Sequence, residues 1–91
     1  MIFHIATELG WETARRAGVY KGDSLESEGF IHCSTADRWE QVRAEWFPDR
    51  DDLVLLEIDP EGLGAEVRWE GGFPHLYGPL EVTAVVSARR L

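Results

Sequence analysis

Phe30-Ile31-His32-Cys33-Ser34 is the stretch of sequence that decides the fold. Apolar residues fall on both faces of this run, which predicts a buried strand over residues 30–34. The next residues predict a helix that is capped by Ser34 or Thr35, because Asp37 then stands at the third helical position, as in a capping box. This helix is expected to end near Phe47, before Pro48.

Two shorter helical segments precede the buried strand. Residues 11–17 predict a helix that stops at Gly18, and residues 24–28 predict a single turn that stops at Gly29. Large apolar residues at helical spacing predict core positions for three tryptophans, which are Trp11, Trp39 and Trp46.

The remaining strands are expected at residues 2–6, 53–58, 65–70 and 80–86. Residues 2–6 are apolar on both faces apart from His4, which predicts a central strand. In residues 65–70, Trp69 is expected to point inward. Residues 73–79 contain two prolines and a glycine, which predicts an irregular loop. This order lacks regular βαβ alternation, so the expected class is α+β, with a small mixed sheet of about five strands and two or three short helices.

Length, charge and cysteine content limit the classes of function. Ninety-one residues predict a single domain over residues 1–91. A formal net charge of −8 argues against nucleic acid or an anionic membrane as the partner. One cysteine excludes an internal disulfide, no apolar run is long enough for a membrane span, and the first residues lack the features of a signal peptide. The expected location is the cytoplasm.

The three histidines are the residues most able to carry chemistry. His4 and His32 stand on strands that are otherwise apolar, so each ring must be satisfied by hydrogen bonds or used in a site. His75 and Tyr77 alternate in a stretch stiffened by prolines, and they are expected to point together. The alternative is that each imidazole ties loops together through backbone carbonyls.

Other reactive groups give weaker signals. Cys33 follows His32 directly and points to the opposite face, which favours an inert buried thiol over a Cys–His nucleophile. The three histidines match no local metal-ligand spacing. Among the many acidic residues, Glu57, Glu70 and Glu81 are the ones worth following.

Several blocks of the sequence carry a resemblance to a known family. These blocks are residues 2–6, Trp11, Tyr20, residues 24–25, 28–34, 55–59, 69–70 and 73–80. In this order they closely resemble the small bacterial family called domain of unknown function 952, over essentially the whole chain. The resemblance implies an ADP-ribosyltransferase-like fold and, with it, NAD as the cofactor.

The resemblance also implies a set of site residues. His4 corresponds to a first-strand residue near the nicotinamide ribose, and the segment from Gly29 to Thr35, with His32 and Ser34 on one face, corresponds to a wall of the NAD pocket. A further block corresponds to His75, Leu76 and Tyr77, with Glu81 beyond. The chain departs from the superfamily pattern here, because no Glu-x-Glu or isolated catalytic glutamate stands at a motif position.

The leading hypothesis is a pocket for NAD or a similar nucleotide-like small molecule. In it, His4 contacts the ribose or phosphate, His32 and Ser34 line the nicotinamide side, and His75 and Tyr77 orient the ligand. ADP-ribosyl or glycosyl transfer would use Glu81 or Glu70 as acid or base. Two alternatives stay open: a non-catalytic ligand-sensing or protein-interaction module, and a metal-assisted hydrolase that uses the three histidines.

Overall fold

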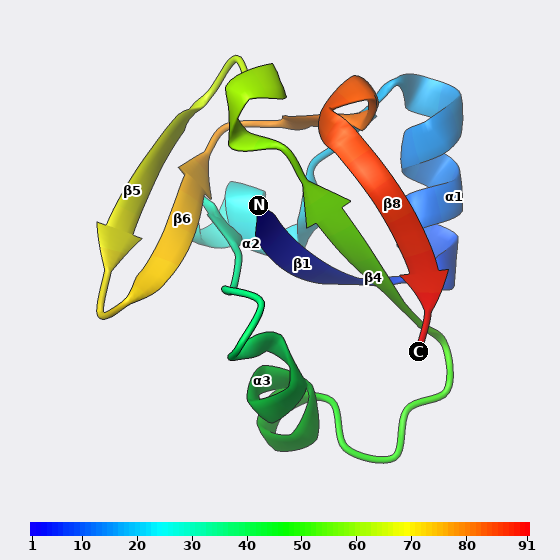
Figure 1. The fold of residues 1–91 in the computed structure, drawn as a ribbon. Helices are drawn as coiled ribbons and strands as arrows, with labels where there is room; N and C mark the ends of the chain where they lie inside the picture. The colour runs from blue at the N-terminus through cyan, green and yellow to red at the C-terminus, as the bar shows by residue number, and fades with distance from the viewer.

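Three helices and eight short strands make up the α+β fold, seen in a computed structural model that describes residues 1–91 (Figure 1). The expected α+β class is confirmed. Every registered strand pair is antiparallel, and the strands form three small sheets instead of one. No helix combines the length and the apolar character that crossing a membrane requires.

The first sheet has the order β1-β4-β8, with bounds Ile2–Thr7, Leu53–Ile58 and Val85–Arg90. β4 is the central strand, between β1 and β8, and five of its six residues are buried. The expectation that the first strand is central is therefore wrong for this sheet. On its other side, β1 makes only an isolated bridge between Phe3 and Ser34.

The second sheet has the order β3-β6-β5, with bounds Ile31–His32, Phe73–Tyr77 and Glu66–Glu70. The irregular loop expected at residues 73–79 is wrong for residues 73–77, which form its central strand. The carbonyl of Pro74 points toward β3, where it accepts the Cys33 N–H. The nitrogen of Pro74, which carries no hydrogen, points to the same strand. The hydrogen bonds between β6 and β5 therefore lose no donor. Gly71 and Gly72, both at positive φ, close the β5–β6 hairpin tightly.

The last predicted strand is interrupted. β7 (Leu80–Glu81) pairs with β2 (Val19–Tyr20), and a 3-10 turn at Val82–Ala84 separates β7 from β8. Residues 80–86 thus contribute to two different sheets. Their apolar pattern alone does not show where one strand ends and the next begins. A further 3-10 turn, Pro60–Gly62, follows β4.

The helices are α1 (Glu8–Ala17), α2 (Gly22–Glu28) and α3 (Trp39–Trp46). α1 begins earlier than expected because the Thr7 side chain accepts the Gly10 N–H as an N-cap. α3 begins later than expected: the Thr35 hydroxyl donates to the Asp37 carboxylate and caps no helical N–H. The expected stops at Gly18 and Gly29 are confirmed as left-handed C-caps.

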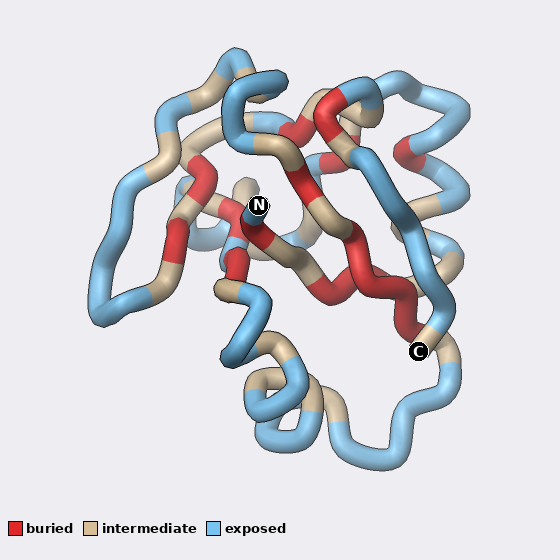
Figure 2. Tube along the Cα trace, viewed as in Figure 1, coloured by how far each residue is buried: buried red, intermediate tan, exposed pale blue.

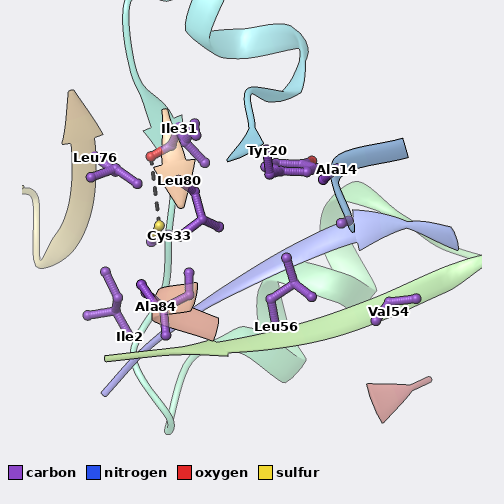
Figure 3. Close-up of a cluster of buried hydrophobic side chains, with 12 residues drawn as sticks. Ile2, Ala14, Tyr20, Ile31, Cys33, Val54, Leu56, Leu76, Leu80 and Ala84 are labelled. Atoms are coloured by element: carbon purple, nitrogen blue, oxygen red, sulfur yellow. Dashed lines mark hydrogen bonds between the residues drawn. The ribbon is translucent and has the colours of Figure 1, made fainter. Parts of the chain in front are cut away.

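Two apolar clusters lie on opposite faces of the first sheet. The larger contains Ile2, Ala6 and Leu56 together with Ala14 of α1 (Figure 3). The smaller contains Ile5, Leu53 and Leu55 and is covered by three residues from α3 and its end, Trp39, Val42 and Phe47. Figure 2 shows buried residues along β4 and β6, with β8 and β5 mostly exposed.

Two of the expected core tryptophans are exposed. Trp46 is 73% exposed, because the stripe of α3 that faces the sheet runs through Trp39, Val42 and Phe47 and leaves Trp46 beside it. Trp69 is 58% exposed on the edge strand β5. Trp11 and Trp39 are partly buried and pack against the clusters as expected.

Candidate functional site

A split between the first and second sheets forms the main cavity of the molecule. Phe3 and Ser34 exchange two backbone hydrogen bonds of 2.8 and 2.7 Å, and these alone join β1 to the segment after β3. Beyond this bridge β3 turns away to pair with β6, while β1 stays with β4. The resulting cavity measures about 1280 Å³ and is lined from β1, all three helices, β3 and β6.

His4 forms part of the cavity wall and is held by two partners. Its Nδ1 lies 2.6 Å from the His32 carbonyl oxygen and its Nε2 lies 2.9 Å from the Tyr20 hydroxyl. A carbonyl can only accept, so Nδ1 carries the proton and Nε2 accepts from Tyr20. Burial lowers the pKa of His4 to about 4, and the bond to the His32 carbonyl offsets only part of that effect. His4 is therefore neutral at pH 7.

The Tyr20 hydroxyl is a dependable donor in this arrangement. Burial, with the nearby charge of Asp23, raises the pKa of Tyr20 to about 12. The rings of Tyr20 and His4 are also in contact, with centroids 5.1 Å apart. In the sequence, Tyr20 appeared only as one of the residues that carry the family resemblance. Its spacing from His4 gave no reason to predict the hydrogen bond between them.

His32 and His75 face each other across the β3–β6 ladder. The Nε2 of His32 donates to the Glu28 carboxylate at 2.9 Å, and the Nδ1 of His75 donates to the Phe73 carbonyl at 2.9 Å. The second nitrogen of each ring makes no hydrogen bond within the chain. In the neutral rings, these two nitrogens are free acceptors.

An aromatic cluster surrounds this pair of histidines. The Phe30 ring lies 4.8 Å from His32, 4.6 Å from His75 and 5.3 Å from Tyr77, measured between centroids. Tyr77 donates to Glu70 at 2.6 Å, which raises the pKa of the Tyr77 hydroxyl. The expected pairing of His75 and Tyr77 on one side of their strand is thus seen through their shared contact with Phe30.

The structure brings some of the predicted site residues together and separates others. His4, His32, His75 and Ser34 line the cavity, whereas the remaining members of the predicted set do not, namely Gly29, Thr35, Tyr77 and Glu81. Glu81 lies against Gly64, whose N–H reaches its carboxylate oxygens at 3.3 and 3.4 Å.

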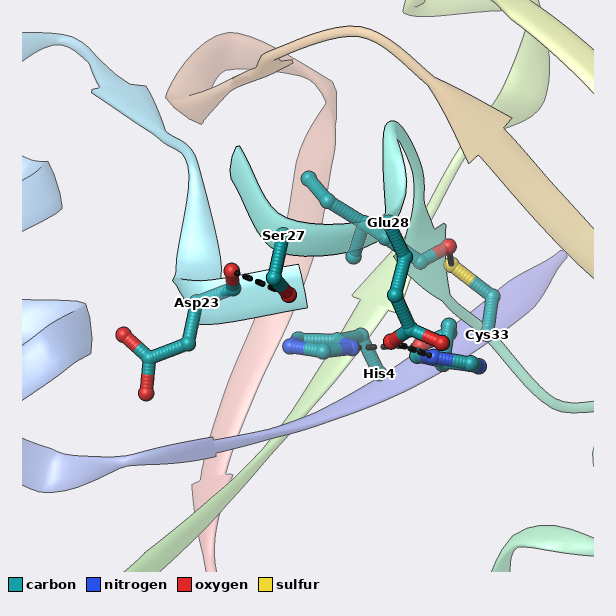
Figure 4. A network of polar contacts seen from close by, with 7 residues as sticks. His4, Asp23, Ser27, Glu28 and Cys33 are labelled. Atoms are coloured by element: carbon teal, nitrogen blue, oxygen red, sulfur yellow. Dashed lines mark hydrogen bonds and ion pairs between the residues drawn. The ribbon is translucent and has the colours of Figure 1, made fainter. Parts of the chain in front are cut away.

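Glu28 is the functional candidate that sequence reasoning missed. It ends α2 (Figure 4). It lines the cavity beside His32, which follows it by four residues. Its separation from His32 was visible in the sequence, but Gly29 breaks the helix between them, so helical i,i+4 spacing gave no reason to pair them.

The geometry also bears on metal and thiol chemistry. The chain contains no group of three histidine, cysteine, aspartate or glutamate side chains that could hold a metal ion. The metal-assisted hydrolase therefore finds no support. Burial raises the pKa of the Cys33 thiol to about 12, which agrees with the inert cysteine expected from the sequence.

Comparison with known proteins places this architecture in a family. The family model described as protein of unknown function (DUF952) matches residues 5–88. The chain belongs to the DUF952 family. Among curated proteins none matches it.

Solved structures of one similar protein share the fold. The crystal structure of protein CC0527 from Caulobacter crescentus superposes with a TM-score of 0.90 at 35% identity, and the match covers 99% of this chain and 84% of that chain. The solution NMR structure of CC0527 gives a TM-score of 0.84 at 34% identity, with 99% and 83% covered. The overall fold is therefore one that experiment has seen in a similar protein.

Proposed function

We propose that the cavity binds a nucleotide-like ligand of the NAD or ADP-ribose type, on an ADP-ribosyltransferase-like version of the fold. The observation that carries the proposal is the convergence of His4, His32 and His75, from three different strands, on one cavity. Its volume, about 1280 Å³, is above the roughly 300–1,000 Å³ of ordinary ligand pockets, so a dinucleotide has room.

The free ring nitrogens assign different roles to the histidines. His32 and His75 have an open acceptor each and contact the ligand directly. His4 has both nitrogens engaged, so it shapes the floor of the site instead of donating to the ribose or phosphate. Among the basic cavity residues, Lys21 supplies positive charge for the phosphates, whereas Arg50 is bonded to the Asp52 carboxylate.

Glycosyl transfer is the finer part of the proposal. Breaking the nicotinamide glycosidic bond develops positive charge on the ribose, and a nearby carboxylate stabilises such a transition state. Glu28 supports this role because it lines the cavity and is held by His32. Glu81 lacks that support because it lies outside the cavity against Gly64.

Amide NMR titration with NAD and ADP-ribose tests the binding. Saturable shifts are expected at His4, at residues 28–34 and at His75, and nicotinamide and zinc serve as separate controls. His75→Ala should weaken binding about tenfold, the effect of losing one good hydrogen bond and a ring contact. Glu81→Gln, outside the cavity, should bind like the wild type.

The absence of saturable shifts with either nucleotide, or shifts confined to a distant surface, would contradict the binding proposal. Catalysis needs its own assay, in which nicotinamide release from NAD is followed by chromatography. Release that persists unchanged in Glu28→Gln would contradict the role given to Glu28, while leaving the binding proposal in place.

A non-catalytic binding module is the second candidate. The observation that favours it is that both nitrogens of His4 bond within the protein, which ties β1, β2 and β3 together. Nucleotide binding without any nicotinamide release would select this alternative.

A further inference from the structure

The edge of β1 that faces the cavity carries backbone groups without partners. In the β1–β4 ladder, the Glu8 N–H bonds to the Asp52 carbonyl and residues 2, 4 and 6 point the same way, so odd-numbered residues point to the opposite edge. Phe3 uses that edge to bond Ser34. The next odd residues, Ile5 and Thr7, have no such partner.

Three groups are therefore free on this edge: the N–H and C=O of Ile5 and the N–H of Thr7. Extending the antiparallel bridge between Phe3 and Ser34 would bring His32 opposite Ile5, but β3 pairs with β6 and leaves that place open. Ile5, Ala6 and Thr7 line the cavity instead. An unpaired edge of this kind is a template for an added strand.

Apolar side chains flank the open edge on both faces of the sheet. Leu9 of α1 is 78% exposed and Trp46 of α3 is 73% exposed, and both line the cavity with β1. α1 packs on the face of Ala6 and α3 on the face of Ile5, so the two helices form opposite walls. Exposed large apolar residues beside a sheet edge are typical of interaction sites.

We propose that β1 binds an extended peptide segment of a partner protein, which adds to the first sheet as a strand between α1 and α3. A peptide residue opposite Ile5 exchanges two hydrogen bonds with it, and a second peptide carbonyl accepts the Thr7 N–H. The side chain opposite Ile5 lies on the α3 wall near Trp46. The side chains next to it lie on the α1 wall near Leu9.

The charge of the chain selects the kind of peptide. The formal net charge is −8, and the charged residues that line the cavity are three acidic ones, Asp23, Glu28 and Glu70, and two basic ones, Lys21 and Arg50, of which Arg50 is paired with Asp52. The peptide that fits is therefore apolar at adjacent positions and neutral or basic elsewhere. This inference rests on the backbone edge of β1, and the peptide lies in the same cavity as the proposed nucleotide.

Selection from a random seven-residue phage-displayed library, followed by binding of the synthetic consensus peptide, tests the inference. The expected peptide slows hydrogen exchange of the Ile5 and Thr7 amides at least about tenfold and shifts both amide signals. Failure to enrich any sequence family, or a consensus peptide whose shifts avoid residues 5–7, would overturn the inference.

Two substitutions at Thr7 form a matched pair. Thr7→Pro removes the N–H that the peptide needs, at a φ of −80° that proline accepts, whereas Thr7→Ala keeps the N–H. Both lose the N-cap, so both should be destabilised similarly, but only Thr7→Pro should weaken peptide binding, by about tenfold or more. Equal affinity of folded Thr7→Pro and Thr7→Ala overturns the inference.

A surface variant keeps the test decisive if Thr7→Pro fails to fold. Leu9→Lys changes an exposed side chain and should leave the fold intact while weakening the consensus peptide about tenfold. Peptide binding is measured without nucleotide, so failure of the peptide site is distinct from failure of the nucleotide site. Unchanged peptide affinity in Leu9→Lys overturns the docking geometry.

Discussion

Acidification should destabilise the protein through His4. The folded-state pKa of His4 is about 4, against 6.5 for an unperturbed histidine. Between pH 6.5 and about pH 4, the His4 ring binds a proton in the unfolded chain but stays neutral in the native state. The free energy of unfolding therefore falls as the pH falls. At about 1.36 kcal/mol for each pKa unit, His4 alone removes about 3 kcal/mol of stability between pH 7.5 and pH 4. Above pH 6.5 its contribution is complete and flat.

Urea denaturation from pH 4 to pH 7.5 measures this effect when the wild type is compared with His4→Gln. The advantage of the wild type over His4→Gln should shrink by about 3 kcal/mol toward pH 4, because the glutamine cannot titrate. His32→Gln is the control, since His32 is exposed and its ring bonds an exposed carboxylate. This control shows whether the change in profile is particular to the buried ring.

An NMR titration of the histidine ring signals gives an independent reading of the same quantity. The His4 ring should keep its neutral Nδ1–H form down to about pH 4. Parallel stability profiles for wild type and His4→Gln, or a His4 ring that titrates near 6.5, would refute the reasoning that burial sets its protonation state.

Three more outcomes follow from the site and the core. Tyr20→Phe deletes the hydroxyl that donates to His4 and should cost about 1–2 kcal/mol in urea denaturation, whereas Tyr77→Phe, at an exposed hydrogen bond, should cost less; equal losses would contradict this ranking. Leu56→Ala, at a fully buried position of β4, should cost about 2–5 kcal/mol, and a loss below 1 kcal/mol would contradict its central place. Cys33 should react with a disulfide reagent at pH 8 only after unfolding, because burial raises its pKa to about 12; rapid reaction of the folded protein would show an accessible thiolate.

The sequence was a good guide wherever one local rule acted alone. The apolar run of β4 predicted its bounds, and Gly18 predicted the end of α1, because burial on both faces and a left-handed C-cap each leave a direct mark on the chain. It failed where a distant partner decided the outcome. Pro74 predicted a break in the strand because proline has no N–H. The pairing with Cys33 uses only the Pro74 carbonyl, so the strand continues.

The candidate site shows the same division. Apolar surroundings singled out His4 and His32 as residues that must be bonded or used. His4 is held by two hydrogen bonds, whereas His32 is exposed, and both line the cavity. The partners of these rings could not be predicted, since Tyr20 on β2 and Glu28 at the end of α2 are brought to them by packing that the sequence does not show. The capping pattern before α3 misled because Thr35 bonds the Asp37 side chain instead of a helical N–H.

The pairing of β1 has a consequence for how the protein is made. Ile2 meets Ile58 and Thr7 meets Leu53, so β1 leaves the ribosome well before its partner strand β4 has been synthesised. Loops of this length must close before their contacts stabilise anything, which slows folding. Until then the apolar strand at residues 2–7 stays unpaired in the nascent chain, where it is prone to aggregation.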